Sequence, residues 1–171
     1  MEYDLLGWPD EGPTLRLDHE RFSYAGKFVM SGTGKAVVRE DGVVAAAAFD
    51  PDRTDADTLR IRYVTVARDR QGEGIGARLL RFVRERAAIR GFDRVVIAVN
   101  NPFAYEAAHK AGFAYTGEGT GIAELVLAWP GDRAARYADG LAAFAERDLD
   151  AAAVAFLDSR GESPPPVVEP P

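Results

Sequence analysis

The chain of 171 residues contains no cysteine and only two histidines, His19 and His109. The lack of thiols excludes disulfides, thiolate metal sites and cysteine nucleophiles. The two isolated histidines do not form a histidine-rich ligand cluster, so we predict no metal. No apolar run approaches the roughly 20 residues that a membrane-spanning helix needs. The acidic first residues lack the basic-then-apolar pattern of a signal peptide. From these absences we predict that the protein is located in the cytoplasm.

Lysine is scarce, and the charge is negative overall. There are 21 basic residues against 27 acidic ones, for a net charge of −6, and the basic residues are scattered. This distribution argues against a nucleic-acid binder, and we predict neither a nucleic-acid nor a membrane partner. A hydrophobic fraction of 47% with 28% charged residues is typical of a globular protein with a sizeable core.

The segment from Leu59 to Arg90 changes from a strand pattern to a helix pattern. It begins with LRIRYVTV, whose β-branched residues and alternation predict a strand. Between strand and helix stand Gly72, Gly74 and Gly76. Glycines here leave backbone N–H groups bare at the positive end of a helix dipole, which suits a phosphate or pyrophosphate. The helix is indicated by the apolar spacing of Ile75, Leu79, Leu80, Val83 and Ala87.

Two well-known phosphate motifs do not fit these glycines. The dinucleotide fingerprint requires G-x-G-x-x-G, whereas the glycines here are at 72, 74 and 76. The P-loop requires G-x-x-x-x-G-K-[ST]. Gly34-Lys35 fails it, because Val29 stands at the first glycine position and Ala36 follows the lysine. A glycine-rich turn without any ligand stays open as an alternative.

Local signals predict most of the other elements. Asp41-Gly42 predicts a two-residue hairpin between strands at 35–40 and 43–49. Residues 1–13 read as an irregular lead-in and Thr14–Leu17 as a first strand. Further along we expect a buried strand at 94–99, a helix that starts near Pro102 and is stopped by Gly112, and last strands at 113–116 and 122–129. The composition predicts one or two alanine-rich helices at 132–158 and a proline-rich tail at 161–171.

Two signatures together resemble the GNAT superfamily of acyl-CoA N-acyltransferases. The first is Gln71-x-x-Gly74-x-Gly76 behind the strand with Val64 and Val66, and the second is Asn101-x-x-Ala104 followed by Gly112-Phe113. The resemblance implies an α/β fold with a mixed, splayed sheet of about six or seven strands and helices on both faces, in an acyltransferase domain at 1–130. The composition beyond it predicts a C-terminal helical extension at 131–160, packed on the domain or at an oligomer interface, and a flexible tail at 161–171.

The resemblance also implies how acetyl-CoA would be held, as a co-substrate and without a metal. Backbone groups of Val64 and Val66 would pair with the pantetheine arm, and the N–H of Val66 would serve as an oxyanion hole. Asn101 would hydrogen-bond the same arm or order the splay. Arg68, Arg70 or Arg78 would lie near the phosphates. The full set of predicted cofactor-binding residues is Val64, Thr65, Val66, Gln71, Gly72, Glu73, Gly74, Ile75, Gly76, Ala77 and Asn101.

The catalytic side chains of the family are only partly present. Arg60 stands where the histone-acetylating branch has a glutamate base, and Ala108 stands where many relatives have a tyrosine acid. Tyr105, one helical turn earlier, and His109 are the candidate substitutes. For each the alternative is a structural or solvated role. Because a thiol has a pKa of about 8.5, coenzyme A can leave as the thiolate without a general acid. Four unranked candidates for the base are Asp50, Asp55, Glu118 and Glu124.

The sequence therefore predicts an N-acetyltransferase that acts on a primary amine by direct attack in a ternary complex. The amine could belong to a small molecule, a peptide or a protein, and a homodimer through the C-terminal helices or a sheet edge is possible. The alternative is a CoA-binding regulatory or scaffold module with weakened chemistry. A weaker third hypothesis is a nucleotide-binding domain of another kind.

Overall fold

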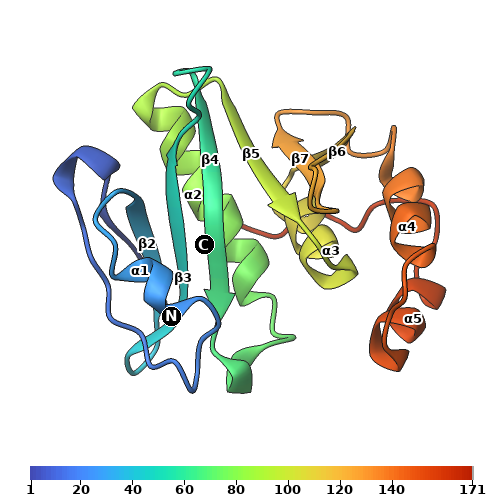
Figure 1. Ribbon diagram of the computed structural model, residues 1–171, viewed down its shortest axis with the longest axis horizontal. Coiled ribbons are helices and arrows are strands. Elements are labelled where there is room, and N and C mark those ends of the chain that lie inside the picture. The colour runs from blue at the N-terminus through green and yellow to red at the C-terminus, as the bar shows by residue number, and fades with distance from the viewer. Residues whose placement is uncertain (171) are drawn as a thin grey trace. The chain divides into compact units, whose positions relative to one another are not determined.

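A computed structural model describes residues 1–170. Within these residues the chain forms seven strands and five α-helices, and the strand order in the sheet is β1-β2-β3-β4-β5-β7-β6 (Figure 1). The predicted mixed α/β class is confirmed. The described residues divide into two compact units, Met1–Val95 with residues 169–170, and Val96–Val168. Each unit is described by itself below. None of the helices in residues 1–170 is both long and apolar enough to cross a bilayer.

The first unit is built on four antiparallel strands. The predicted hairpin is confirmed, because Asp41 and Gly42 join two strands with positive φ values of 53° and 99°. Positive φ at both central residues matches the right-handed twist of the flanking strands. The elements are β1 (Glu2–Gly7), η1 (Pro9–Glu11), α1 (Ala25–Phe28), β2 (Gly34–Arg39), β3 (Val43–Pro51), β4 (Thr58–Val66), η2 (Arg68–Arg70) and α2 (Ile75–Arg90).

The helices α1 and α2 cover opposite faces of these strands (Figure 1). Phe28 of α1 packs with Val37, Ala46 and Ala48 on one face. Side chains of alternate strand residues point to the other face, where α2 packs with its apolar side. The helix periodicity predicted from the sequence is confirmed, since Ile75, Leu79, Leu80, Val83 and Ala87 are all buried.

The start of the chain differs from the prediction. Residues 1–13 are not an irregular lead-in, because Glu2–Gly7 forms β1 and pairs with β2. The predicted strand at Thr14–Leu17 is wrong, although Leu15 and Leu17 still pack against the core cluster around Phe28. The apolar alternation at 14–17 therefore reflects packing of Leu15 and Leu17 and not a strand. The first strand forms at Glu2–Gly7, because that segment pairs with β2.

Lys35 anchors the segment between β1 and β2. Its side chain is fully buried, and burial lowers the pKa of its ammonium group. Nζ donates to the carbonyl oxygens of Pro13 (2.7 Å), Met30 (2.6 Å) and Thr33 (2.8 Å), and to Thr33 Oγ1 (2.9 Å). One ammonium thus satisfies backbone acceptors from three places in the segment and fixes its path beside β2.

The second unit contains the end of β5 (Arg94–Val99) and all later elements. These are α3 (Pro102–Lys110), β6 (Ala114–Gly119), β7 (Leu125–Trp129), α4 (Tyr137–Ala145) and α5 (Ala151–Asp158). The last two strands start later than predicted, at Ala114 in place of 113 and at Leu125 in place of 122. Residues 120–124 instead form a turn in which Thr120 and Glu124 bond each other's backbone and side chain.

The C-terminal part contains two helices, α4 and α5, where one or two were expected at 132–158. Tyr137, Leu141 and Phe144 form the buried face of α4, whereas Ala145 is exposed. The residues after α5 have no helix or strand up to 170. They contact the unit through Pro165, whose carbonyl accepts from Arg133 Nη2, and Val168, whose N–H donates to the Lys110 carbonyl (2.8 Å). Flexibility of the tail and the domain limits at 130 and 160 stay predictions.

Replacing Lys35 by methionine should destabilise the protein by about 3 kcal/mol, because three part-buried carbonyl groups lose their common donor. Lys27→Met is the matched control, since Lys27 is exposed and the same change there should cost less than about 0.5 kcal/mol. Equilibrium unfolding in urea measures both. Equal midpoints for the two variants would contradict the anchoring role.

Candidate functional site

The carboxyl end of β4 carries the backbone groups predicted to bind a ligand. Val64 is opposite Ala47 of β3 and Val66 is opposite Ala45, so one edge of β4 is occupied by the antiparallel ladder. The side chain of Val66 points to the α2 face, where its Cγ2 lies 3.4 Å from the position a Cβ on Gly76 would take. Thr65 is buried on the face of α1.

The chain turns from β4 into α2 through left-handed backbone. Gly72 has φ 83° and Gly74 has φ 79°, conformations that L side chains rarely adopt. A Cβ on Gly72 would meet no atom within 4 Å, so the turn opens onto free space there. We call residues 71–77 the glycine corner.

The glycine corner ends in a helix start without a side-chain cap. Gly74 is the N-cap of α2 and has no side chain to accept from the first N–H groups of the helix. The first backbone bond of the helix runs from Arg78 N to the Gly74 carbonyl (3.2 Å). The N–H groups of Ile75, Gly76 and Ala77 therefore stand at the positive end of the dipole, where an anionic group is stabilised.

Charged and polar side chains surround the corner. Arg70 Nε donates to Glu73 Oε2 (2.9 Å) and its Nη2 to Glu40 (3.1 Å). Arg78 Nη1 donates to the Glu73 carbonyl (3.3 Å) and lies 3.6 Å from the Cβ position of Gly74. Gln71 Nε2 donates to the Val66 carbonyl (3.3 Å), which ties the corner to the end of β4. Arg70 and Arg78 thus lie at the glycine corner, and both donate hydrogen bonds to other groups of the protein.

Arg68, the third predicted arginine, has a different role. Its N–H donates to the Arg21 carbonyl (2.9 Å), and its Nη1 donates to the carbonyls of His19 (3.2 Å) and Glu20 (2.5 Å). The Arg21 guanidinium in turn lies 3.6 Å from an Asp69 carboxylate oxygen. These contacts fasten residues 19–21 to the end of β4.

In the second unit Asn101 is the N-cap of α3. Its Oδ1 accepts from the Ala104 N–H (2.8 Å), and Pro102 follows at the first helical position. Our sequence analysis did not predict this cap, although asparagine directly before a proline at a helix start is its usual signal. Any contact of Asn101 with a ligand stays a prediction.

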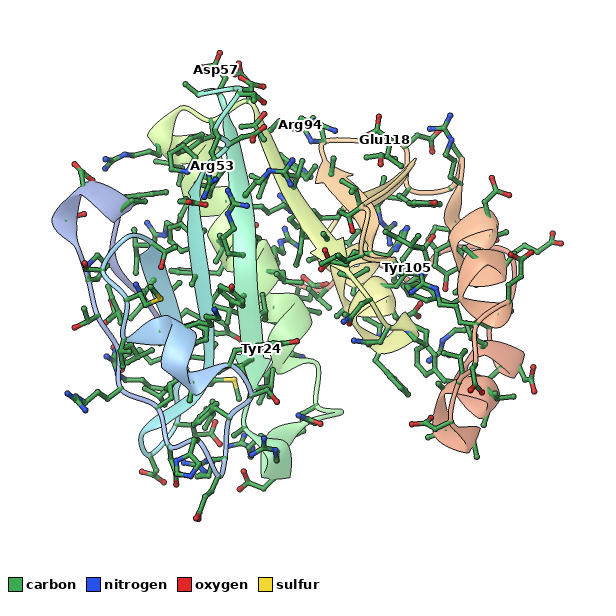
Figure 2. The ribbon with its side chains drawn as sticks, in the orientation of Figure 1. Tyr24, Arg53, Asp57, Arg94, Tyr105 and Glu118 are labelled. Carbon is green, nitrogen blue, oxygen red and sulfur yellow. The ribbon has the colours of Figure 1, made fainter. Side chains whose placement is uncertain are left out.

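Tyr105 and His109 lie on one side of α3 and are fully buried. Tyr105, labelled in Figure 2, stacks on Tyr137 of α4 with ring centroids 5.8 Å apart, and its hydroxyl donates to the Tyr137 carbonyl (2.9 Å). A Cβ on Gly140 would lie 2.0 Å from the Tyr105 hydroxyl oxygen, so only glycine admits this ring. The predicted solvated alternative for His109 is wrong, because the helix α4 covers its ring.

Burial also sets the ionisation of these groups. Burial is the main cause that raises the pKa of the Tyr105 hydroxyl, and the neighbouring Tyr137 adds to it. Burial lowers the pKa of His109 to about 4. His109 Nδ1 lies 2.9 Å from the Tyr105 carbonyl, and within residues 1–170 its Nε2 has no hydrogen-bond partner. Both groups are therefore neutral at pH 7.

A carboxylate that the sequence analysis missed completes this cluster. Glu106 is almost fully buried and accepts a hydrogen bond from the Tyr137 hydroxyl (2.7 Å). Its other oxygen lies 3.3 Å from Arg160 Nε, which is a charge contact without hydrogen-bond geometry. No local pattern signals these pairs, since their partners are more than 30 positions apart along the chain.

The acidic candidates for a general base mostly have structural partners. Asp50 accepts from Arg62 Nε (2.5 Å), and Asp55 caps its own loop by accepting from Thr58 Oγ1 (2.7 Å) and the Asp57 N–H (3.0 Å). Glu124 accepts from Thr120, and Glu118 is exposed. Arg60 lies 3.3 Å from Asp52. Within residues 1–170 no group of three histidine, aspartate or glutamate side chains could hold a metal ion.

Comparison with known proteins gives a family match. A model of the acetyltransferase (GNAT) family matches residues 2–113, which is more than half of the chain. No curated protein matches the sequence significantly.

Similar solved structures include three acetyltransferases. An IAA acetyltransferase from Bacillus cereus is 24% identical with a TM-score of 0.47, covering 56% of this chain and 76% of that one. YncA, a putative acetyltransferase from Salmonella typhimurium with acetyl-CoA, is 23% identical with a TM-score of 0.48, covering 57% of this chain and 64% of that one. PaiA N-acetyltransferase from Thermoplasma acidophilum with coenzyme A is 14% identical with a TM-score of 0.48, covering 55% of this chain and 58% of that one. These similarities do not bear on individual residues.

The buried His109 should make stability depend on pH. Its pKa is about 4 in the folded chain against 6.5 for the free group, so the unfolded chain binds a proton first as pH falls. At roughly 1.4 kcal/mol per pKa unit, the wild-type chain should lose about 3 kcal/mol more than His109→Phe between pH 7 and pH 4. His19→Phe, at an exposed histidine, should keep the wild-type slope. Identical pH profiles for wild type and His109→Phe would refute this.

Proposed function

Because the chain belongs to the GNAT family of acetyltransferases, we propose that it transfers an acetyl group from acetyl-CoA to a primary amine in a ternary complex. The observation that carries the proposal is the glycine corner, an open and uncapped helix start directly behind β4. In a chain of this family, such an anion site suits the pyrophosphate of coenzyme A. The whole corner lies inside the family match.

The residues of the first unit would hold the cofactor through backbone groups. The N–H groups from Gly72 to Ala77 would donate to the pyrophosphate. The backbone of Val64 and Val66 would pair with the pantetheine arm as an added strand. The Val66 N–H would donate to the thioester carbonyl where negative charge develops during attack. These roles use no side chain, so the valine and alanine identities at these positions are compatible with them.

The reaction needs a neutral amine and a leaving thiolate. An alkyl amine with a pKa near 10.4 is neutral in about one molecule in a few thousand at pH 7, so the rate should rise with pH. The amine nitrogen attacks the thioester carbon, the new C–N bond forms and the C–S bond breaks. The sulfur leaves as a thiolate, and the proton lost by nitrogen ends on solvent or on the thiol. A thiol pKa of about 8.5 makes this departure possible without an acid.

The catalytic roles predicted for Tyr105 and His109 have little support from their surroundings. The Tyr105 hydroxyl already donates to the Tyr137 carbonyl, and both rings are enclosed by α4. The same observation favours the second candidate function, a CoA-binding module with weakened chemistry. The two functions differ in whether acetyl-CoA is consumed in the presence of amines.

The test of the proposal compares two glycines that both have positive φ, Gly72 (83°) and Gly42 (99°). Gly72→Asp and Gly42→Asp both place a carboxylate at positive φ where a Cβ meets nothing within 4 Å, but Gly42 is in the hairpin after β2. Gly72→Asp should weaken coenzyme A binding by at least about tenfold, about 1.4 kcal/mol, through charge repulsion. Gly42→Asp should bind like wild type. Calorimetry measures binding, and thiol release from acetyl-CoA across an amine panel measures transfer.

Three results would count against the proposal. If the protein does not bind coenzyme A, the proposal is wrong. If Gly72→Asp and Gly42→Asp weaken coenzyme A binding equally, the glycine corner is not the binding site. Tight binding without amine-dependent thiol release would leave the weakened module as the function.

Tyr105→Phe should change kcat less than about threefold, because the thiolate leaves without a proton and the hydroxyl is engaged by backbone. Its stability should fall by about 1–2 kcal/mol, since the Tyr137 carbonyl loses a buried donor. Steady-state kinetics and urea unfolding measure the two effects. A fall in kcat of a hundredfold or more would show that Tyr105 is the general acid after all.

A further inference from the structure

The three lysines of the chain lie in different surroundings. Lys35 is fully buried, and its ammonium makes four hydrogen bonds to Pro13, Met30 and Thr33. Lys110 is half-buried in the second unit, in the last turn of α3. Lys27, in the last turn of α1, is exposed. Within Met1–Val95, Lys27 is thus the exposed lysine that the fold leaves with a movable ammonium group.

Lys27 is held close to the strand that would bind the acetyl group. Its Nζ lies 5.8 Å from the ring centroid of Tyr63, the residue before Val64 on β4. Tyr63 and Val66 are three residues apart, which at about 3.3 Å per residue is roughly 10 Å along the strand. The four-carbon stem of a lysine is flexible, so its ammonium can move from Tyr63 along the strand toward Val66.

The backbone around Lys27 is fixed on the same strand end. Residues 19–21 are bonded to Arg68 just after β4, and the Lys27 N–H donates to the Tyr24 carbonyl (2.8 Å). Tyr24 begins α1 with φ 63°, a strained conformation for a bulky residue, and its ring lies 5.6 Å from that of Tyr63. All of these residues belong to the first unit, so the proximity does not depend on the second.

The contact that holds the ammonium is weak. A cation–π contact at an exposed site is worth about 0.5–1 kcal/mol, so the Lys27 side chain leaves Tyr63 often. Lys35 has no such freedom, because moving its ammonium would leave three carbonyls without a donor. The geometry therefore makes Lys27, and not Lys35, the candidate acyl acceptor in the first unit.

We propose that the protein acetylates its own Lys27 in cis, which rests on the proposed function. The neutral Nζ attacks the thioester carbon of acetyl-CoA, the N–C bond forms and the C–S bond breaks. Coenzyme A leaves as the thiolate, and the proton from nitrogen passes to solvent or to the thiol. The product is acetyl-lysine at position 27, which no longer carries a positive charge over the Tyr63 ring.

The experiment incubates the full chain with acetyl-CoA and follows acetylation of each lysine by mass spectrometry of intact protein and of peptides. Lys27 should be acetylated to near completion, about tenfold or more faster than Lys110. Lys27→Arg should remove this acetyl group, and Lys110→Arg is the matched control that should leave it. The first-order rate constant should not change with protein concentration, because the acceptor is in the same chain.

Two further measurements separate catalysis from chemical acetylation. The chain unfolded in urea, and Gly72→Asp, should acetylate Lys27 at the slow rate of Lys110. Equal rates at Lys27 and Lys110 in the folded wild type would overturn the proposal, and so would a rate that rises with protein concentration. Coenzyme A binding and amine-dependent thiol release with an unmodified Lys27 would overturn self-acetylation and leave the proposed function standing. Absence of coenzyme A binding would remove both.

Discussion

The left-handed backbone at Gly72 and Gly74 is the constraint on which the glycine corner depends. Two positive φ values let the chain turn from the segment after β4 into α2, at positions where other residues would be strained. Because Gly74 is also the N-cap, the turn that makes the connection leaves the first amides of α2 without a side-chain acceptor. The same two glycines thus join the elements and leave the amides of the proposed anion site exposed.

The second unit uses its polar groups in the opposite way. Tyr105, Tyr137 and Glu106 are buried between α3 and α4 and are bonded to each other or to backbone, so they specify how these helices pack. A hydroxyl that serves as a fixed donor inside a helix interface is poorly placed to move a proton. Under the proposed function, acyl transfer would therefore depend on positioning, on the proposed backbone oxyanion donor and on a leaving group that needs no acid.

Local signals in the sequence were sufficient for part of this account. The Asp41-Gly42 turn and the apolar spacing of α2 act over a few residues, and the structure agrees with both. The strand β1 and the burial of His109 could not be predicted, because they depend on pairing with β2 and on cover by α4, both distant in sequence. The glycine corner was predicted from spacing and its contacts with a cofactor stay a prediction, whereas no sequence pattern indicates the polar partners of Tyr105.

The most direct measurement is a titration of isotopically labelled protein with coenzyme A, followed through its backbone amide resonances. If the corner holds the pyrophosphate, the amides of Gly72 to Ala77 should shift most, and pantetheine, which lacks the phosphates, should leave them almost unchanged. Shifts of equal size with pantetheine, or a corner that stays silent while coenzyme A binds, would contradict the central claim.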